Sequence, residues 1–290
     1  MVPCWFDRAW RIPRRFPRPS SPTVATIQTA DRLAALGRVI DGFPEFAPTK
    51  MGTRDPARTL TPSVEQHLRD WAPTIRPGDY FNQFMYRREP RIYGLLWVTG
   101  DIWNYPPIGP HELDFGVDED WFTGSDRSAR LERFAELFRA ACESMDAMWG
   151  GAGLTSFRRQ KNDFVDRAQL AGTLVIPGMP GTGWDSRERA LPDLYWLNYF
   201  GPATLDLWGD ALDGLGVRQQ PTGNGGVVVW TTETPFVFDG GAQRMTDYAW
   251  KRPFYDALGW DTIMHENWTD PGAGVHVPTY QDHRRFTAKG

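Results

Sequence analysis

The stretch LPDLYWLNYFGPATLDLWG at Leu191–Gly209, together with GGVVVWTTETPFVF at Gly225–Phe238, decides the fold class. Aromatic and branched side chains dominate Leu194–Phe200, as they do in a mostly buried strand. Gly201 then permits a turn, and Pro202 suits the first turn of a helix. The stretch therefore predicts a strand, a tight turn and the start of a helix.

A short helix and a second strand are predicted after this turn. The run Val227–Trp230 is too short for a free helix and favours a central strand, which Pro235 ends because proline cannot donate to a ladder. Asn198, in the first strand, is predicted to be a buried amide bonded to neighbouring backbone rather than a catalytic group. The apolar face of the helix has three- and four-residue spacing: Leu205, Trp208, Leu212 and Leu215.

Apolar stripes at helical spacing predict three further helices. One covers Asp31–Ile40, and another runs from a cap at Thr61 to a stop at Pro73. The most regular covers Ser128–Trp149, includes Cys142 as a core thiol on its apolar face, and is ended by two glycines.

Strand composition on both sides of Glu89-Pro90 predicts an antiparallel hairpin of Asp79–Arg88 and Arg91–Gly100. Further short elements are strands at Gly153–Phe157 and Leu170–Ile176, and a helix containing Met245, Tyr248 and Ala249.

The domain organisation follows from the lack of internal repeats and long linkers. We expect a single α+β domain over residues 26–290, with a mainly antiparallel sheet and helices packed on it. Residues 1–25 are rich in proline and arginine without apolar periodicity, which predicts a disordered basic tail. Residues 260–290 are irregular and are expected to wrap over the domain as a C-terminal extension.

The charge of the chain is uneven. Its formal net charge is −4, of which residues 1–20 contribute +4 and the remaining 270 residues −8. An acidic body argues against nucleic-acid binding, which requires phosphates to be neutralised, and is compatible with a basic protein partner. No apolar run is long enough to span a membrane, and the first residues lack the apolar core of a secretory signal. With Cys4 and Cys142 as the two cysteines, no disulfide framework is expected, so a cytoplasmic location is predicted.

No sequence motif predicts a cofactor or a nucleophile, and we expect neither a cofactor nor a metal. One C-terminal group of side chains could instead form a metal site or an acid–base pair. Its spacing matches no tight ligand pattern, which favours a solvated tail. The group comprises His265, Glu266, Asp270, His276, Asp282 and His283.

An acidic and aromatic segment, Asp101–Trp121, is the other candidate site. Three prolines, two glycines and the lack of a period predict a long exposed loop. Carboxylates there would attract a basic partner and aromatic rings would anchor it, although a merely solubilising loop is equally consistent. The candidate contact residues are Trp103, Tyr105, Glu112, Asp114, Asp118, Glu119, Asp120 and Trp121.

Roughly residues 79–259 resemble the immunity-protein-52 family of bacterial polymorphic toxin systems, and related type VI secretion immunity domains. The resemblance is carried by Ser128–Trp149, Tyr195–Pro202, Trp208-Gly209 and Gly226–Trp230. It implies an α+β protein that binds and neutralises a cognate toxin without catalysis. The motif residues are Trp196, Asn198, Gly201, Pro202, Trp208, Gly209 and Gly226.

Three functions thus follow as hypotheses. The first is a non-catalytic binding protein, an immunity protein that occludes a toxin. The second is a metal-dependent hydrolase that uses the C-terminal His, Asp and Glu group. The third is a structural subunit of a phage or secretion assembly.

Overall fold

The computed structural model describes residues 2–8, 23–53, 58–60, 62–75, 80–99, 111–147, 149–153, 194–235, 252–258, 269–270 and 274–275. The predicted α+β class, with antiparallel strands and packed helices, is confirmed. Contacts divide the chain into two compact units. Unit 1 holds residues 1–150 and 222–224, and unit 2 holds residues 151–221 and 225–290.

Unit 1 contains an antiparallel sheet in the order β3-β2-β4-β5-β6-β1. The predicted hairpin is confirmed, because β4 and β5 pair antiparallel on either side of the Glu89-Pro90 turn. The strands are β1 (Val2–Arg8), β2 (Lys50–Gly52), β3 (Arg58–Thr59), β4 (Tyr80–Arg87), β5 (Ile92–Thr99) and β6 (His111–Val117).

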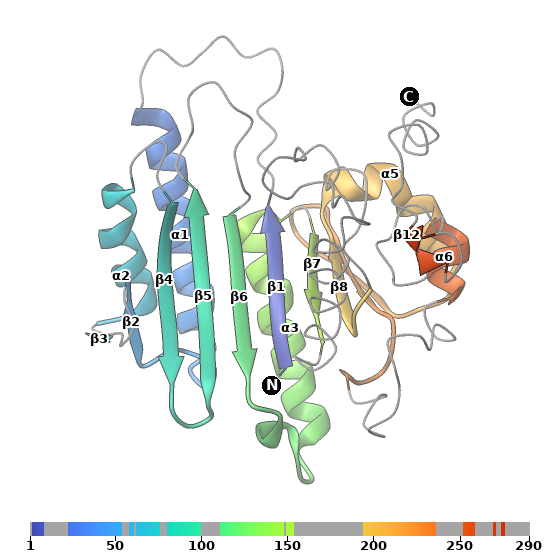
Figure 1. Ribbon diagram of the computed structural model, residues 1–290, viewed down its shortest axis with the longest axis horizontal. Coiled ribbons are helices and arrows are strands. Elements are labelled where there is room, and N and C mark those ends of the chain that lie inside the picture. Colours follow the sequence, from blue (N-terminus) through green and yellow to red (C-terminus); the bar gives the residue numbers. More distant parts are fainter. Residues whose placement is uncertain are drawn as a thin grey trace. The chain divides into compact units, whose positions relative to one another are not determined.

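Three helices of unit 1, α1 (Thr23–Asp41), α2 (Val64–Trp71) and α3 (Arg127–Met145), lie on the same side of strands β4, β5 and β6 (Figure 1). Short 3₁₀ helices follow α2 (η1, Ala72–Thr74) and precede α3 (η2, Glu119–Phe122). The core between helices and sheet is filled with large apolar side chains, as close packing of a protein interior requires. Fully buried members include Leu36, Ile40, Leu68, Met85, Ile92, Leu96, Phe134 and Phe138.

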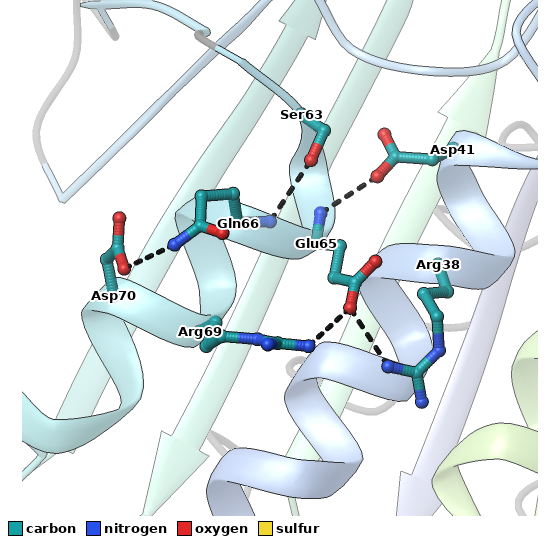
Figure 2. A network of polar contacts seen from close by, with 7 residues as sticks. All are labelled: Arg38, Asp41, Ser63, Glu65, Gln66, Arg69 and Asp70. Carbon is teal, nitrogen blue, oxygen red and sulfur yellow. Dashed lines mark hydrogen bonds and ion pairs between the residues drawn. The ribbon is translucent and has the colours of Figure 1, made fainter.

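The start of α2 is fixed by side chains from two segments (Figure 2). Ser63 is the N-cap, and its Oγ accepts a hydrogen bond from the Gln66 N–H at 3.2 Å. The Asp41 carboxylate, at the end of α1, accepts from the N–H groups of Val64 and Glu65 at 3.0 and 2.9 Å. The cap predicted at Thr61 is therefore wrong by two residues, because Ser63 and Asp41 together satisfy the free donors of the first turn.

Close packing between α1 and α2 depends on Gly37. A Cβ at this position would lie 2.7 Å from the backbone nitrogen of Glu65, which is too close for a real contact. Glu65 Oε1 accepts from Arg38 of α1 at 2.9 Å and from Arg69 of α2 at 2.5 Å (Figure 2). A glycine thus sets the separation of the helices, and one carboxylate bridges them.

The disordered tail predicted over residues 1–25 is corrected at residues 2–8 and 23–25, while residues 9–22 lie outside the described residues. Val2–Arg8 form β1, which pairs with β6 along its whole length, and α1 begins at Thr23. In this register Val2, Cys4 and Phe6 lie opposite Val117, Phe115 and Leu113, and these three β6 residues are buried. The sequence does contain the apolar residues at alternate positions that this pairing requires, although the segment is rich in proline and arginine.

The end of α3 also differs from the prediction. The helix stops at Met145 because Asp146 adopts a left-handed conformation with φ of 50°, and Trp149 lies in β7 (Trp149–Ala152). Glu143 in the last turn accepts from the Gly223 N–H at 3.0 Å, within unit 1. Cys142 is fully buried, as predicted.

Unit 2 contains the antiparallel strands β8 (Leu197–Phe200), β10 (Val227–Trp230) and β9 (Gln219–Pro221), with β10 between the other two. The central position predicted for Val227–Trp230 is confirmed. The helix predicted after Gly201 is α5 (Pro202–Asp213), and it contacts α6 (Arg252–Leu258). Two-residue strands β11 (Thr269–Asp270) and β12 (Gly274–Val275) form a separate pair.

The centre of unit 2 is organised by a buried amide and a glycine. The Asn198 side chain is fully buried, accepts from the Tyr195 N–H at 3.0 Å and donates to the Tyr195 carbonyl at 2.8 Å. The predicted structural role of Asn198 is therefore confirmed. At Gly226, a Cβ would lie 2.6 Å from Cζ of the fully buried Tyr199.

The elements predicted at Leu170–Ile176 and around Met245, and all but the first residue of Gly153–Phe157, lie outside the described residues, as does most of the segment 260–290. No helix in the described part of the chain has the length and apolar character needed to cross a membrane.

Candidate functional site

The predicted acidic and aromatic loop is in part a regular element. His111–Val117 form β6, between β5 and β1, and Glu119–Phe122 form η2, whereas Trp103 and Tyr105 lie outside the described residues. The loop prediction over Asp101–Trp121 is therefore wrong from residue 111 onward. Leu113, Phe115 and Val117 are buried at alternate positions, which is the pattern of a strand covered on one face.

Trp121 packs into the protein instead of standing out from it. Its ring is half-buried and lies edge-on to Phe46 and Phe122, with ring centroids 5.0 and 5.2 Å apart. The Arg130 guanidinium lies 5.1 Å from the ring centroid and donates to the Trp121 carbonyl at 2.6 Å. Packing of this kind stabilises the turn before α3.

The remaining acids of the predicted set lie at several places in unit 1. Glu112 and Asp114 belong to β6, and Asp114 is half-buried. Asp118 precedes η2, and its N–H donates to the Arg91 carbonyl at 2.9 Å, while Glu119 and Asp120 open η2. Asp120 is exposed, and Glu119 is half-buried.

The motif residues of the family resemblance have structural positions in unit 2. Trp196, Asn198 and Trp208 are buried, and Gly201 caps α5 before Pro202. Gly209 is inside α5, where a Cβ would have the Leu205 side chain as its nearest neighbour, at 3.9 Å. These residues therefore belong to the scaffold of unit 2.

The C-terminal acid and histidine group is mostly outside the described residues. This applies to His265, Glu266, His276, Asp282 and His283, and Asp270 lies in β11. Within the part of the chain that the structure describes, no three His, Cys, Asp or Glu side chains are grouped so that they could hold a metal ion.

Two exposed tyrosines mark the best candidate surface. Tyr86 of β4 is 37% exposed and Tyr93 of β5 is 43% exposed, and they are the large hydrophobic side chains that are exposed among the described residues. The hairpin register places them directly opposite each other. Opposite residues have Cβ atoms about 5 Å apart, so the two rings form one aromatic surface.

Strand alternation explains why the tyrosines face outward. Their chain neighbours Met85 and Ile92 are fully buried in the core beside the helices, and successive side chains point to opposite faces. Phe84 pairs with Leu95, Leu95 pairs with Asp114, and all three are half-buried. We call the set Phe84, Tyr86, Tyr93, Leu95 and Asp114 the outer face.

The sequence interpretation missed this surface although it contained the signal. Tyr86 and Tyr93 are equally distant from the Glu89-Pro90 turn, so a regular hairpin must pair them. What the sequence alone does not show is that the helices cover the opposite face, with Met85 and Ile92. Asp114 is the predicted contact residue that the register brings to this surface.

The outer face is suited to binding and offers apolar area with phenol hydroxyls at its exposed end. Tyrosine has few rotatable bonds, so ordering it against a partner costs little entropy, and it is enriched at protein interfaces.

In the comparisons with known proteins, no family model and no curated protein matches the chain.

Proposed function

We propose that this protein works by binding another protein through the outer face, and that its partner is a bacterial toxin which it neutralises by occlusion. The observation that carries the proposal is the pair Tyr86 and Tyr93, both exposed and directly opposite on a sheet whose other face is packed with helices. The sheet holds the pair rigidly, so the surface is ready for a partner before it arrives.

The energy available from such a surface supports specific binding. Tyrosine is among the residues that most often dominate interface energetics, and burying a ring adds area as well as a hydrogen-bond partner. The half-buried Phe84 and Leu95 extend the apolar area along the same strands. A partner that covers all four side chains would exclude water from the centre of the contact.

The choice of a toxin as partner rests on the resemblance of Tyr195–Pro202 and Gly226–Trp230 to immunity proteins. These segments supply the buried centre of unit 2, with Asn198 and Tyr199 fully buried. Because they are scaffold residues, they indicate the fold better than the function.

Co-expression with the protein encoded beside this chain's gene tests the proposal. We expect the two to co-purify and the chain to restore growth of bacteria that express the neighbouring protein. The variant Tyr86→Ala/Tyr93→Ala should lose both effects. The matched control is Gln220→Ala, which removes an exposed strand side chain from unit 2. If the two proteins co-purify but the tyrosine variant changes neither growth nor yield, the assigned surface is contradicted. If the wild-type chain does not co-purify with the neighbouring protein, the immunity role is contradicted.

A further inference from the structure

The exposed charges next to the tyrosine pair are mainly basic. Lys50 of β2 pairs directly with Tyr86, and Arg88 and Arg91 lie in the turn between β4 and β5. All three side chains are exposed, and none makes a hydrogen bond or ion pair in the part of the chain that the structure describes. Glu89 is the exposed acid of the same turn.

The acids on the β6 side are less available. Asp114 and Asp118 are both half-buried, and the Asp118 N–H donates to the Arg91 carbonyl at 2.9 Å. The Arg87 guanidinium is already hydrogen-bonded within the protein, because it donates to the carbonyls of Ala47 at 3.1 Å and Glu89 at 2.9 Å. Among the described side chains around the tyrosines, the exposed charges are therefore Lys50, Arg88 and Arg91 against Glu89.

We propose that the outer face receives an acidic segment of the partner protein. The rings of Tyr86 and Tyr93 would pack on its apolar atoms, while Lys50, Arg88 and Arg91 would pair with its Asp and Glu carboxylates. The proposal rests on the function proposed above and names the chemistry of the partner. It reverses the sign expected from the acidic segment 101–121, because the exposed aromatic surface has basic neighbours.

Charge complementarity favours a protein over a nucleic acid. Nucleic-acid binding depends on neutralising several phosphates, and three cations on a chain of net charge −4 supply few such contacts. Complementary charges of this number are typical of protein interfaces, where they guide encounter and set specificity. Binding of single-stranded DNA is accordingly an outcome that would count against the proposal.

Selection from a random peptide display library on the full chain tests this chemistry. Parallel selections use Tyr86→Ala/Tyr93→Ala, Lys50→Glu/Arg88→Glu/Arg91→Glu, and the milder Lys50→Gln/Arg88→Gln/Arg91→Gln. Asp114→Asn/Asp118→Asn is the arm that tests for a partner of the opposite sign, and Gln220→Ala in unit 2 is the control. Circular dichroism checks that each variant is folded. We expect the peptides that require Tyr86 and Tyr93 to be rich in Asp and Glu. Their affinity should fall at least about tenfold with the cation variants, and should weaken as salt is added.

Three results overturn the inference. One is enrichment of Lys and Arg in the selected peptides with loss of binding in the acid variant. Another is tyrosine-dependent binding that neither the charge variants nor salt change, which leaves the proposed protein-binding function intact. The third is binding of an oligo-dT strand that depends on Lys50, Arg88 and Arg91. If no selected peptide depends on Tyr86 or Tyr93, the proposed function itself fails.

Discussion

Asn198 shows, at the scale of a single residue, why a polar side chain can belong in a core. Both the oxygen and the nitrogen of its amide bond to the backbone of Tyr195, so neither polar end of the side chain is buried without a partner. The sequence was sufficient to predict this role, because a lone amide inside a strongly apolar strand has backbone as its nearest partner.

Replacing Asn198 by Leu should destabilise the protein markedly. The substitution keeps the approximate size of the side chain but removes the amide acceptor of the Tyr195 N–H and one of the donors to the Tyr195 carbonyl, which also accepts from the Thr231 hydroxyl, at a total cost of about 1–3 kcal/mol. Urea denaturation followed by tryptophan fluorescence measures the effect. An unchanged midpoint would show that the amide hydrogen bonds contribute nothing to stability.

Two glycines of unit 2 make a matched pair for a second prediction. Gly226→Ala forces a Cβ against the buried ring of Tyr199 and should cost about 1–3 kcal/mol. Gly209→Ala, in the middle of α5 with no neighbour closer than 3.9 Å, should instead stabilise by up to about 1 kcal/mol. Equal effects of the two substitutions in thermal unfolding would contradict the close contact between Gly226 and Tyr199.

At the scale of elements, the sequence predicted what depends on local signals. The β4–β5 hairpin, α5 after Gly201 and the central strand β10 are each marked by nearby proline, glycine or apolar runs. Elements that depend on distant partners were missed. β1 is a strand because it pairs with β6, more than a hundred residues further along the chain, and α2 begins where Asp41 of α1 meets it.

The Asp41 cap gives an element-scale prediction. Asp41→Ala removes the acceptor for two N–H groups of α2 and should destabilise the protein by about 1–2 kcal/mol, whereas Asp41→Asn should retain part of the cap. The control is Asp70→Ala, which removes an exposed hydrogen bond to Gln66 in the same helix and should change stability by less than about 0.5 kcal/mol. Equal denaturation midpoints for the Asp41→Ala and Asp70→Ala variants would show that Asp41 does not hold the start of α2.

At the scale of the whole molecule, two different sets of residues matter. One set indicates the fold class, and the other is proposed to contact the partner. The aromatic segments of unit 2 are buried, while the exposed tyrosines belong to the sheet of unit 1. Sequence reasoning found the first set through its composition, since aromatic density signals a core. The pairing of Tyr86 with Tyr93 could have been predicted from their equal distance to the turn, but their exposure could not, because it depends on which face of the sheet the helices cover (Figure 1).

The central claim is that Tyr86 and Tyr93 form the binding surface, and isothermal titration calorimetry of the folded chain with the neighbouring-locus protein tests it most directly. We predict that Tyr86→Ala and Tyr93→Ala each raise the dissociation constant about tenfold or more while the thermal stability is retained. The Gln220→Ala variant should bind with the affinity of the wild type. An affinity that is the same for the wild type and for both tyrosine variants would contradict the account.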